Sequence, residues 1–270
     1  MGRVIAVASQ KGGVGKTTTT VNLAASLASM NLKTLILDLD EQNAVGLGLG
    51  LVRSEMETGI FDVFLGRKKL SEIIRPTGIR WLKMIPYGKG TLTEEFEKFV
   101  REKGSAPLLK KYIGAIRKSC DYILIDCPPG MGELSIYALS AADSVLVPQQ
   151  CEPLSLKTLT QILKTIRKVR NNVNPSLAIE GILLTMYDER YRIAREILRQ
   201  VWNTFPPGVV FKTVIPRNEE YSNIFAVGRP IIAQAPDSEL AKTYLRLAAE
   251  VHQKVLKEER RQAGQPPASA

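Results

Sequence analysis

The sequence predicts an α/β protein with a twisted, mostly parallel sheet that helices cover on both faces. Short apolar runs alternate with segments of helical periodicity, the order expected when each strand is followed by a crossover helix. The runs are almost continuously apolar, which is typical of strands buried on both sides. Glycine-rich or acidic residues follow several runs directly, at the strand ends where such sheets bind ligands.

Six apolar runs are the predicted strands. The first ends in a glycine-rich loop, and a helix is predicted just after it, over residues 17–30. The second and third runs end in aspartates. The region 50–110 is less regular and is predicted to hold a small hairpin at 79–85. The six runs lie at residues 4–8, 34–38, 122–126, 144–148, 181–185 and 209–215.

The chain shows neither a domain linker nor an internal repeat. Its 270 residues suit one α/β domain, which we expect to cover residues 1–261. The last stretch, 262–270, is rich in Pro, Ala, Gly and Ser, and this composition predicts a disordered tail.

The net charge of +10 favours a polyanionic partner, either nucleic acid or an anionic membrane surface. A basic enzyme without such a partner would show the same charge. The three cysteines, Cys120, Cys127 and Cys151, lack metal-binding spacing and fit free thiols in a reducing cytosol. The chain has no signal peptide and no apolar run of about 18 residues, so we expect a cytoplasmic protein, associated with the nucleoid if its partner is DNA.

A phosphate-binding loop is predicted between the first strand and the first helix. Glycines let backbone N–H groups curl around phosphate oxygens, and the helix directs its positive N-terminus at them. Lys16 is predicted to neutralise the β- and γ-phosphates, and the Thr17 hydroxyl to ligate Mg²⁺. Two lysines in one glycine loop repel each other unless an anion is bound, which favours a nucleotide over an empty turn. The loop reads Lys11-Gly12-Gly13-Val14-Gly15-Lys16-Thr17-Thr18.

Acidic residues end two of the predicted strands. Asp126 follows an apolar strand, as a Walker B acid does, and is predicted to hold Mg²⁺ through water. Asp40 is a candidate for positioning the attacking water and for the Mg²⁺ site. Asp38 is assigned to the loop or to the Mg²⁺ shell. A simple strand-end cap is the alternative for Asp126.

Four segments together resemble the ParA/MinD family of deviant Walker A ATPases, a branch of the P-loop NTPases, and come closest to chromosomal ParA, also called Soj. Gln10 stands where the Walker A pattern has its first glycine, and Lys11 matches the signature lysine of the family. The likeness runs from about residue 3 to residue 256. The four segments are residues 10–18, 37–43, 125–129 and 214–218.

The resemblance implies an ATP-dependent sandwich homodimer with ATP and Mg²⁺ as cofactors. Lys11 would reach across to the partner's nucleotide, Gly12 would lie at the subunit contact, and Asp40 would support hydrolysis beside Lys16. The ATP dimer would bind double-stranded DNA nonspecifically, and a ParB-like protein would stimulate turnover, in chromosome or plasmid partitioning. The residues implied in ATP binding are Lys11, Gly12, Gly13, Val14, Gly15, Lys16, Thr17, Thr18 and, on the adenine side, Pro216 and Asn218.

Two glutamates depart from the family pattern. Glu41 follows Asp40 where the branch usually has proline, and it adds a charge beside the water-positioning acid. Glu220 stands where the family usually has an arginine that contacts DNA. A carboxylate repels phosphate, so this position argues against DNA binding at that point.

Two predicted helices could still bind a polyanion. Arg192, Arg195 and Arg199 share one face of a helix, and Arg190 and Arg217 are further candidate DNA contacts. A solvated charged face is the alternative for either helix, but a dimer would double the patch and favour salt-dependent binding. The second helix, 156–170, turns apolar residues inward and leaves to solvent Lys157, Lys164, Arg167, Lys168 and Arg170.

Three functions other than partitioning are alternatives. A ParA-like ATPase could position another cargo and differ only in its adaptor. A MinD- or FlhG-like membrane ATPase needs a C-terminal amphipathic helix, but glutamates interrupt the apolar face of 244–261, so we predict a core or surface helix and no membrane binding. A redox ATPase similar to nitrogenase iron protein needs two cluster cysteines per subunit, which the cysteine positions do not supply.

Overall fold

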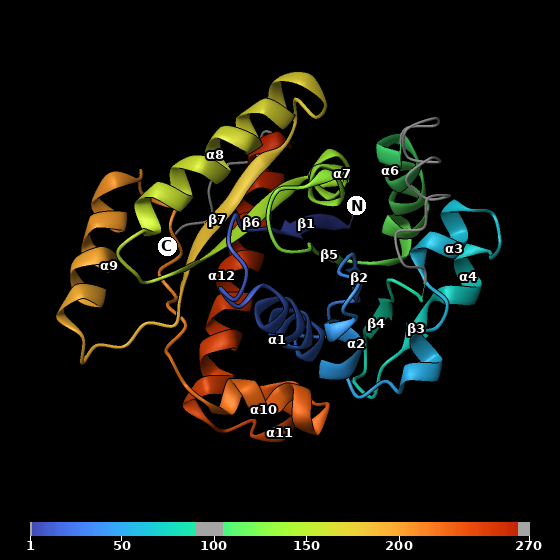
Figure 1. Cartoon of the computed structure of the whole chain (residues 1–270), viewed down its shortest axis with the longest axis horizontal. Coiled ribbons are helices and arrows are strands. Elements are labelled where there is room, and N and C mark those ends of the chain that lie inside the picture. Colours follow the sequence, from blue (N-terminus) through green and yellow to red (C-terminus); the bar gives the residue numbers. More distant parts are fainter. Residues whose placement is uncertain (1, 90–104, 264–270) are drawn as a thin grey trace.

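The computed structural model describes residues 2–89 and 105–263, which form a seven-stranded sheet in the order β3-β4-β2-β5-β1-β6-β7 (Figure 1). Neighbouring strands are parallel except β3, which is antiparallel to β4. The predicted fold class is confirmed. The strands are β1 (Arg3–Val7), β2 (Thr34–Asp38), β3 (Arg75–Pro76), β4 (Leu82–Ile85), β5 (Tyr122–Asp126), β6 (Ser144–Gln150) and β7 (Ala178–Thr185).

Helices cover both faces of this sheet and bury a separate apolar core on each side (Figure 1). One core includes α1 (Lys16–Ser29), α2 (Ala44–Gly48), α10 (Glu220–Val227), α11 (Ile231–Gln234) and α12 (Glu239–Gln262). The other includes α3 (Ile60–Phe64), α4 (Leu70–Ile73), α6 (Ser105–Ile116), α7 (Glu133–Ala141), α8 (Ser155–Asn172) and α9 (Arg192–Thr204). Two short 3-10 helices, η1 (Arg53–Met56) and η2 (Arg117–Ser119), complete the elements described.

The long C-terminal helix α12 packs its apolar face into the core. Leu247, Val251 and Val255 are buried beside α1, so the face that a membrane anchor would need is already occupied. None of the helices in the described ranges combines the length and the apolar character that a membrane span requires. The tail predicted to be disordered lies, from residue 264 onward, outside the described residues.

The sixth predicted strand, residues 209–215, is wrong. This segment runs beside β7 but forms only isolated bridges, from Val210 to Ile182 and from Pro216 to Tyr187. The cause is a side chain on α12. The carboxylate of Glu250 accepts the backbone N–H groups of Lys212 (2.8 Å) and Thr213 (3.1 Å), so Thr213 does not donate to β7, although Phe211 and Ile215 on either side of it do.

The predicted hairpin at 79–85 forms, but its first strand begins earlier, at Arg75. Its second strand, β4, also pairs in parallel with β2 and so joins the hairpin to the main sheet. Trp81 adopts the left-handed backbone conformation in the turn, with φ 69°.

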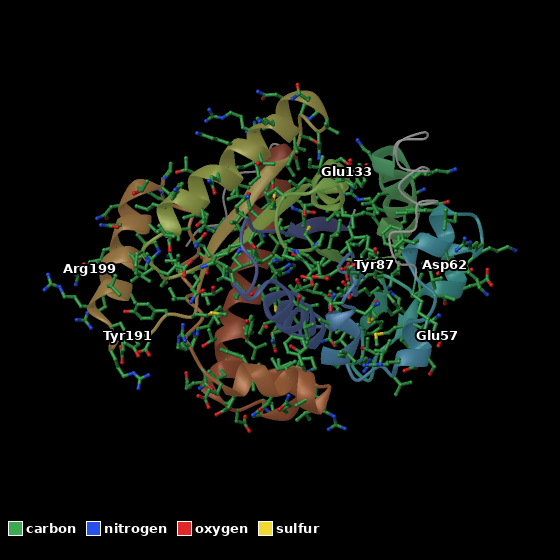
Figure 2. All side chains as sticks on the ribbon, viewed as in Figure 1. Glu57, Asp62, Tyr87, Glu133, Tyr191 and Arg199 are labelled. Atoms are coloured by element: carbon green, nitrogen blue, oxygen red, sulfur yellow. The ribbon has the colours of Figure 1, made fainter. Side chains whose placement is uncertain are left out.

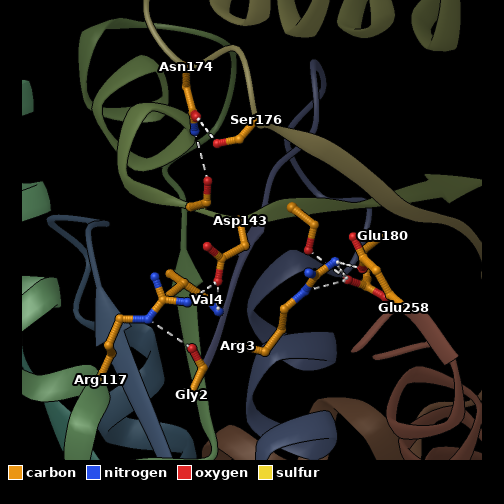
Figure 3. Close-up of polar contacts among 11 residues, drawn as sticks. Gly2, Arg3, Val4, Arg117, Asp143, Asn174, Ser176, Glu180 and Glu258 are labelled. Atoms are coloured by element: carbon orange, nitrogen blue, oxygen red, sulfur yellow. Dashed lines mark hydrogen bonds and ion pairs between the residues drawn. The ribbon is translucent and has the colours of Figure 1, made fainter. Parts of the chain in front are cut away.

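Ion pairs tie the amino-terminal end of the central strand to distant elements (Figure 3). Arg3 at the start of β1 lies 3.0 Å from Glu180 on β7 and 2.8 Å from Glu258 on α12. On the other side of β1, Arg117 bonds to the carboxylate of Asp143 at 2.7 Å. These contacts hold the base of the sheet, and the candidate site lies at its opposite edge.

Candidate functional site

The loop between β1 and α1 owes its shape to two glycines. Gly13 and Gly15 have φ values of 73° and 86°, a left-handed conformation that side chains other than glycine rarely adopt. No side chain caps the first turn of α1, so its backbone N–H groups remain available to a ligand. Such an N-terminus attracts anions.

Lys16 is buried at the first position of α1. Its side chain has 7 % relative exposure, and its Nζ lies 3.4 Å from the hydroxyl oxygen of Ser9. No carboxylate within the described ranges lies at ion-pair distance from it. The Asp126 carboxylate attracts Lys16 electrostatically without a direct contact, and a buried ammonium that lacks a direct ion pair is costly. The residues present therefore fit an anion such as a phosphate beside Lys16.

Two aspartates lie side by side at the carboxyl ends of β2 and β5, where Asp38 is in register with Asp126. Asp126 accepts hydrogen bonds of 2.7 Å from the hydroxyls of Thr17 and Thr20. Burial raises the pKa of Asp126 to about 6, although these hydrogen bonds oppose the rise. Burial and the Asp126 carboxylate raise the pKa of Asp38 well above its usual range.

This pair of buried carboxyl groups fits a nearby cation. One oxygen of Asp38 accepts the backbone N–H of Asp40 at 2.9 Å, while Oδ2 is buried without a hydrogen-bond partner. The described residues contain no group of three or more His, Cys, Asp or Glu side chains that could hold a metal. The pair formed by Asp38 and Asp126 suits Mg²⁺, which proteins commonly bind through one or two side chains together with phosphate oxygens and water.

A cavity of about 360 Å³ joins the predicted phosphate residues to Asp40. Asp40 is partly buried, and its Oδ1 accepts the backbone N–H of Gln42 at 3.1 Å. The cavity is also lined by Pro129, Met186 and Phe225, which the sequence analysis did not select. The predicted residues that line it are Gly12, Gly13, Gly15, Lys16, Thr17, Thr18 and Asp40.

Lys11 turns away from this cavity. Its Nζ lies 2.7 Å from Oε1 of Glu152, in the segment between β6 and α8. Gly12 is exposed, and a Cβ added there would meet only the Cβ of Pro129, at 3.6 Å. A side chain at Gly12 would therefore cause no steric clash within a single chain.

A second cavity, of about 830 Å³, shares Gly15, Thr18, Met186 and Phe225 with the first. It is lined by Pro216 and Asn218, which the sequence resemblance predicts on the adenine side, together with Glu220 and Tyr221. Met186 follows β7 directly, and this place at the carboxyl end of a strand could have identified it as a candidate site residue. Phe225 lies within α10 and carried no comparable signal.

Comparison with known proteins identifies the family. Residues 2–179 match the family model AAA_31, described as an AAA domain. The chain is 40% identical over 251 residues to the chromosome partitioning protein ParA of Myxococcus xanthus, an alignment that covers 93% of this chain and 88% of that protein. It is 41% identical to the sporulation initiation inhibitor protein Soj of Bacillus subtilis, covering 93% of this chain and 98% of that protein. The chain belongs to the ParA/MinD family.

A solved structure agrees with this membership. Cobyrinic acid a,c-diamide synthase from Mycobacterium smegmatis, with a bound ATP analogue and magnesium, superposes with a TM-score of 0.79 and 29% identity over 100% of both chains. The ligands of that protein are the two cofactors that the sequence analysis expects. In this ParA/MinD-family chain the two cavities adjoin, because both are lined by Gly15, Thr18, Met186 and Phe225.

The candidate DNA contacts of this ParA/MinD-family chain do not form one patch of free charge. Arg190 lies 2.7 Å from Asp188, and Arg192 lies 2.7 Å from Glu196. Arg190 and Arg217 line the larger cavity. Arg195 donates to the backbone oxygen of Glu189.

Arg199 on α9 and Tyr191, the residue just before this helix, point outward from the molecule (Figure 2). Tyr191 is 58% exposed and Trp202 is 42% exposed, so large aromatic side chains accompany the arginines on the surface. Glu220 is exposed at the start of α10, where the family pattern has arginine. Charge of both signs therefore surrounds the larger cavity.

Proposed function

We propose that this chain is a Mg²⁺-dependent ATPase of the ParA type. The observation that carries the proposal is the buried ammonium of Lys16, which faces the glycine loop and has no carboxylate at ion-pair distance among the described residues. The uncapped start of α1 and Lys16 together would bind the β- and γ-phosphates. Pro216 and Asn218, in the adjoining cavity, would contact the adenine base.

Hydrolysis would depend on positioning and charge rather than on a covalent intermediate. Mg²⁺, when bound, would neutralise the charge that develops on the phosphates. Thr17 would ligate it and would keep the 2.7 Å hydrogen bond that its hydroxyl donates to Asp126. Asp40 lines the same cavity as Lys16 and Thr17, which supports a role in orienting the attacking water.

The wider cycle is also proposed. ATP would bring two copies together through the face that bears the glycine loop, with Lys11 reaching the partner's nucleotide and Gly12 at the contact. The ATP dimer would bind nonspecific double-stranded DNA, and a ParB-like protein would stimulate turnover and release. The relative named chromosome partitioning protein ParA supports a role in chromosome partitioning. A different cargo would use the same cycle.

Replacing Lys16 by Ala tests the nucleotide site. Charge-assisted hydrogen bonds of this kind contribute about 1.5–3 kcal/mol, so affinity for a fluorescent ATP analogue with Mg²⁺ should fall about 10- to 100-fold. Lys69→Ala, an exposed lysine remote from the loop, serves as the matched control. Equal affinities of the two variants would refute the assignment of Lys16.

A second experiment separates DNA from a membrane surface. Co-sedimentation of the protein with DNA and with anionic liposomes is compared in ADP and in a non-hydrolysable ATP analogue. We expect ATP-dependent, salt-sensitive binding to DNA and none to liposomes. Liposome binding alone would favour the membrane-associated alternative.

A further inference from the structure

A separate cavity of about 440 Å³ lies at the amino-terminal ends of β2 and β4. It is bounded by the β3–β4 hairpin and by the C-terminal end of α6, and we call it the hairpin cavity. The nucleotide site lies at the carboxyl ends of the same strands, roughly 15 Å away at about 3.3 Å per residue. Its apolar lining comprises Ile74, Pro76, Ile79, Trp81, Leu82 and Ile116.

Trp81 at the mouth of the hairpin cavity has an unusual backbone. Its φ of 69° is a left-handed conformation that a turn normally assigns to Gly or Asn, and a bulky side chain there is an outlier. The ring is nevertheless 38% exposed. The turn does not require an aromatic side chain. The ring at this position therefore points to a role other than forming the turn.

Cations surround this ring. The guanidinium of Arg80 lies 5.0 Å from the ring centroid, and Nζ of Lys33 lies 6.0 Å from it. Lys33 and Lys83 both line the cavity and are exposed. Within the part of the chain that the structure describes, no carboxylate lines the cavity or pairs with these three cations. A neighbouring acid, Asp121, accepts the backbone N–H of Lys33 at 2.7 Å.

We propose that the hairpin cavity is a docking site for an acidic peptide segment of a partner protein. The segment would place one large apolar side chain against Trp81 and Ile116, and its carboxylates would lie on Lys33, Lys83 and Arg80. An exposed Trp beside an apolar cavity is the kind of residue that dominates binding energy at interfaces. The cations around it, which have no carboxylate partner among the described residues, complement an acidic peptide.

The position of the hairpin cavity separates docking from the nucleotide cycle. A partner bound at the amino-terminal ends of β2 and β4 would leave the glycine loop and Asp40 uncovered. It could therefore stay bound in every nucleotide state, including a dimer formed through the face that bears the glycine loop. This is the property that an adaptor to cargo requires.

The test begins with a phage-displayed library of random peptides of about 12 residues, selected against the full chain without nucleotide. We expect enrichment of peptides rich in Asp and Glu that contain Trp, Phe or Leu. An enriched peptide is then synthesised and titrated. The chain has two tryptophans, so Trp202→Phe leaves Trp81 as the only one and its fluorescence reports binding directly.

Charge reversal distinguishes the hairpin cavity from general attraction to a basic protein. In Lys33→Glu/Lys83→Glu the Kd of the peptide should rise at least about tenfold. The control, Lys110→Glu/Lys111→Glu, changes the net charge equally on the exposed surface of α6 and should leave the Kd unchanged. An equal loss in both variants, or a loss in neither, would overturn the proposal, as would a selection that enriches no acidic peptides.

Substitution of the ring provides a second measurement. Trp81→Gly supplies the residue that the turn favours, so the far-ultraviolet circular dichroism should be kept while peptide binding is lost. Trp81→Phe should retain most of the affinity. Lys16→Ala should bind the peptide like the wild type, because docking uses no residue of the nucleotide site. If the ATPase proposal failed, peptide binding at the hairpin cavity would still stand. If peptide binding failed, the ATPase proposal would be unaffected.

Discussion

The ammonium of Lys11 lies 2.7 Å from the carboxylate of Glu152, at the start of the segment that leads from β6 into α8. Lys11 is thus held within its own chain, although the proposed dimer needs it at the partner's nucleotide. Forming that dimer would require this ion pair to open. Glu152 would therefore oppose the proposed dimerisation.

Removing the charge of Glu152 should make dimerisation easier. The pair is partly exposed, with side chains 49% and 21% accessible, and such pairs contribute about 0.2–1 kcal/mol. Two such pairs would open in each dimer, so Glu152→Gln should strengthen ATP-dependent dimerisation by up to about 30-fold in analytical ultracentrifugation. Lys11→Ala should bind ATP as a monomer. Weaker dimerisation of Glu152→Gln would show that Glu152 serves the dimer rather than the resting chain.

Asp40 should govern turnover but not binding. Its carboxylate lines the cavity with Lys16, yet makes no contact with either Lys16 or Asp126 that Asp40→Ala would break. The variant should bind ATP and remain a dimer on size exclusion, with hydrolysis reduced about 100-fold or more. Asp237→Ala, an exposed acid before α12, should cycle normally. A monomeric Asp40→Ala protein in ATP would contradict the role of Asp40.

The arginines of α9 should set the salt dependence of DNA binding. Three phosphate contacts in each subunit of a dimer would make the slope of the log association constant against log salt concentration more negative by about 5. Charge reversal of Arg192, Arg195 and Arg199 should abolish that part of the slope in a gel-shift titration. The matched control reverses Lys69, Lys110 and Lys111, which are equally exposed. An unchanged slope would remove α9 from the DNA-binding surface.

Gly181 on β7 should be sensitive to a single methyl group. A Cβ there would lie 2.5 Å from the ring of Phe211, which is buried on the segment beside β7. Overpacking of this kind costs about 1–3 kcal/mol, so Gly181→Ala should lower the free energy of unfolding in urea by that amount. Gly114→Ala on exposed α6 meets nothing within 4 Å and should raise it by about 0.5–1 kcal/mol. Equal stabilities would show that Phe211 can move aside.

The strands and the phosphate site could be predicted because their signals are local. Apolar runs mark β1, β2 and β5, and parallel pairing brings the residues that follow them to one edge, which is why Thr17 meets Asp126. The failed strand at 209–215 depended on Glu250, far along the chain on α12. The resting partner of Lys11 and the place of Phe225 likewise depend on tertiary packing, which no local pattern encodes.

The position of β1 also has a consequence for synthesis on the ribosome. β1 is the first strand made, yet both of its neighbours, β5 and β6, begin only at residues 122 and 144. Its ion pair with Glu258 needs the end of α12. Contacts this distant in sequence form late, so the emerging chain must keep an apolar strand unpaired through much of translation. Nascent chains stalled before residue 122 should therefore depend on chaperones, whichever cargo the finished protein serves.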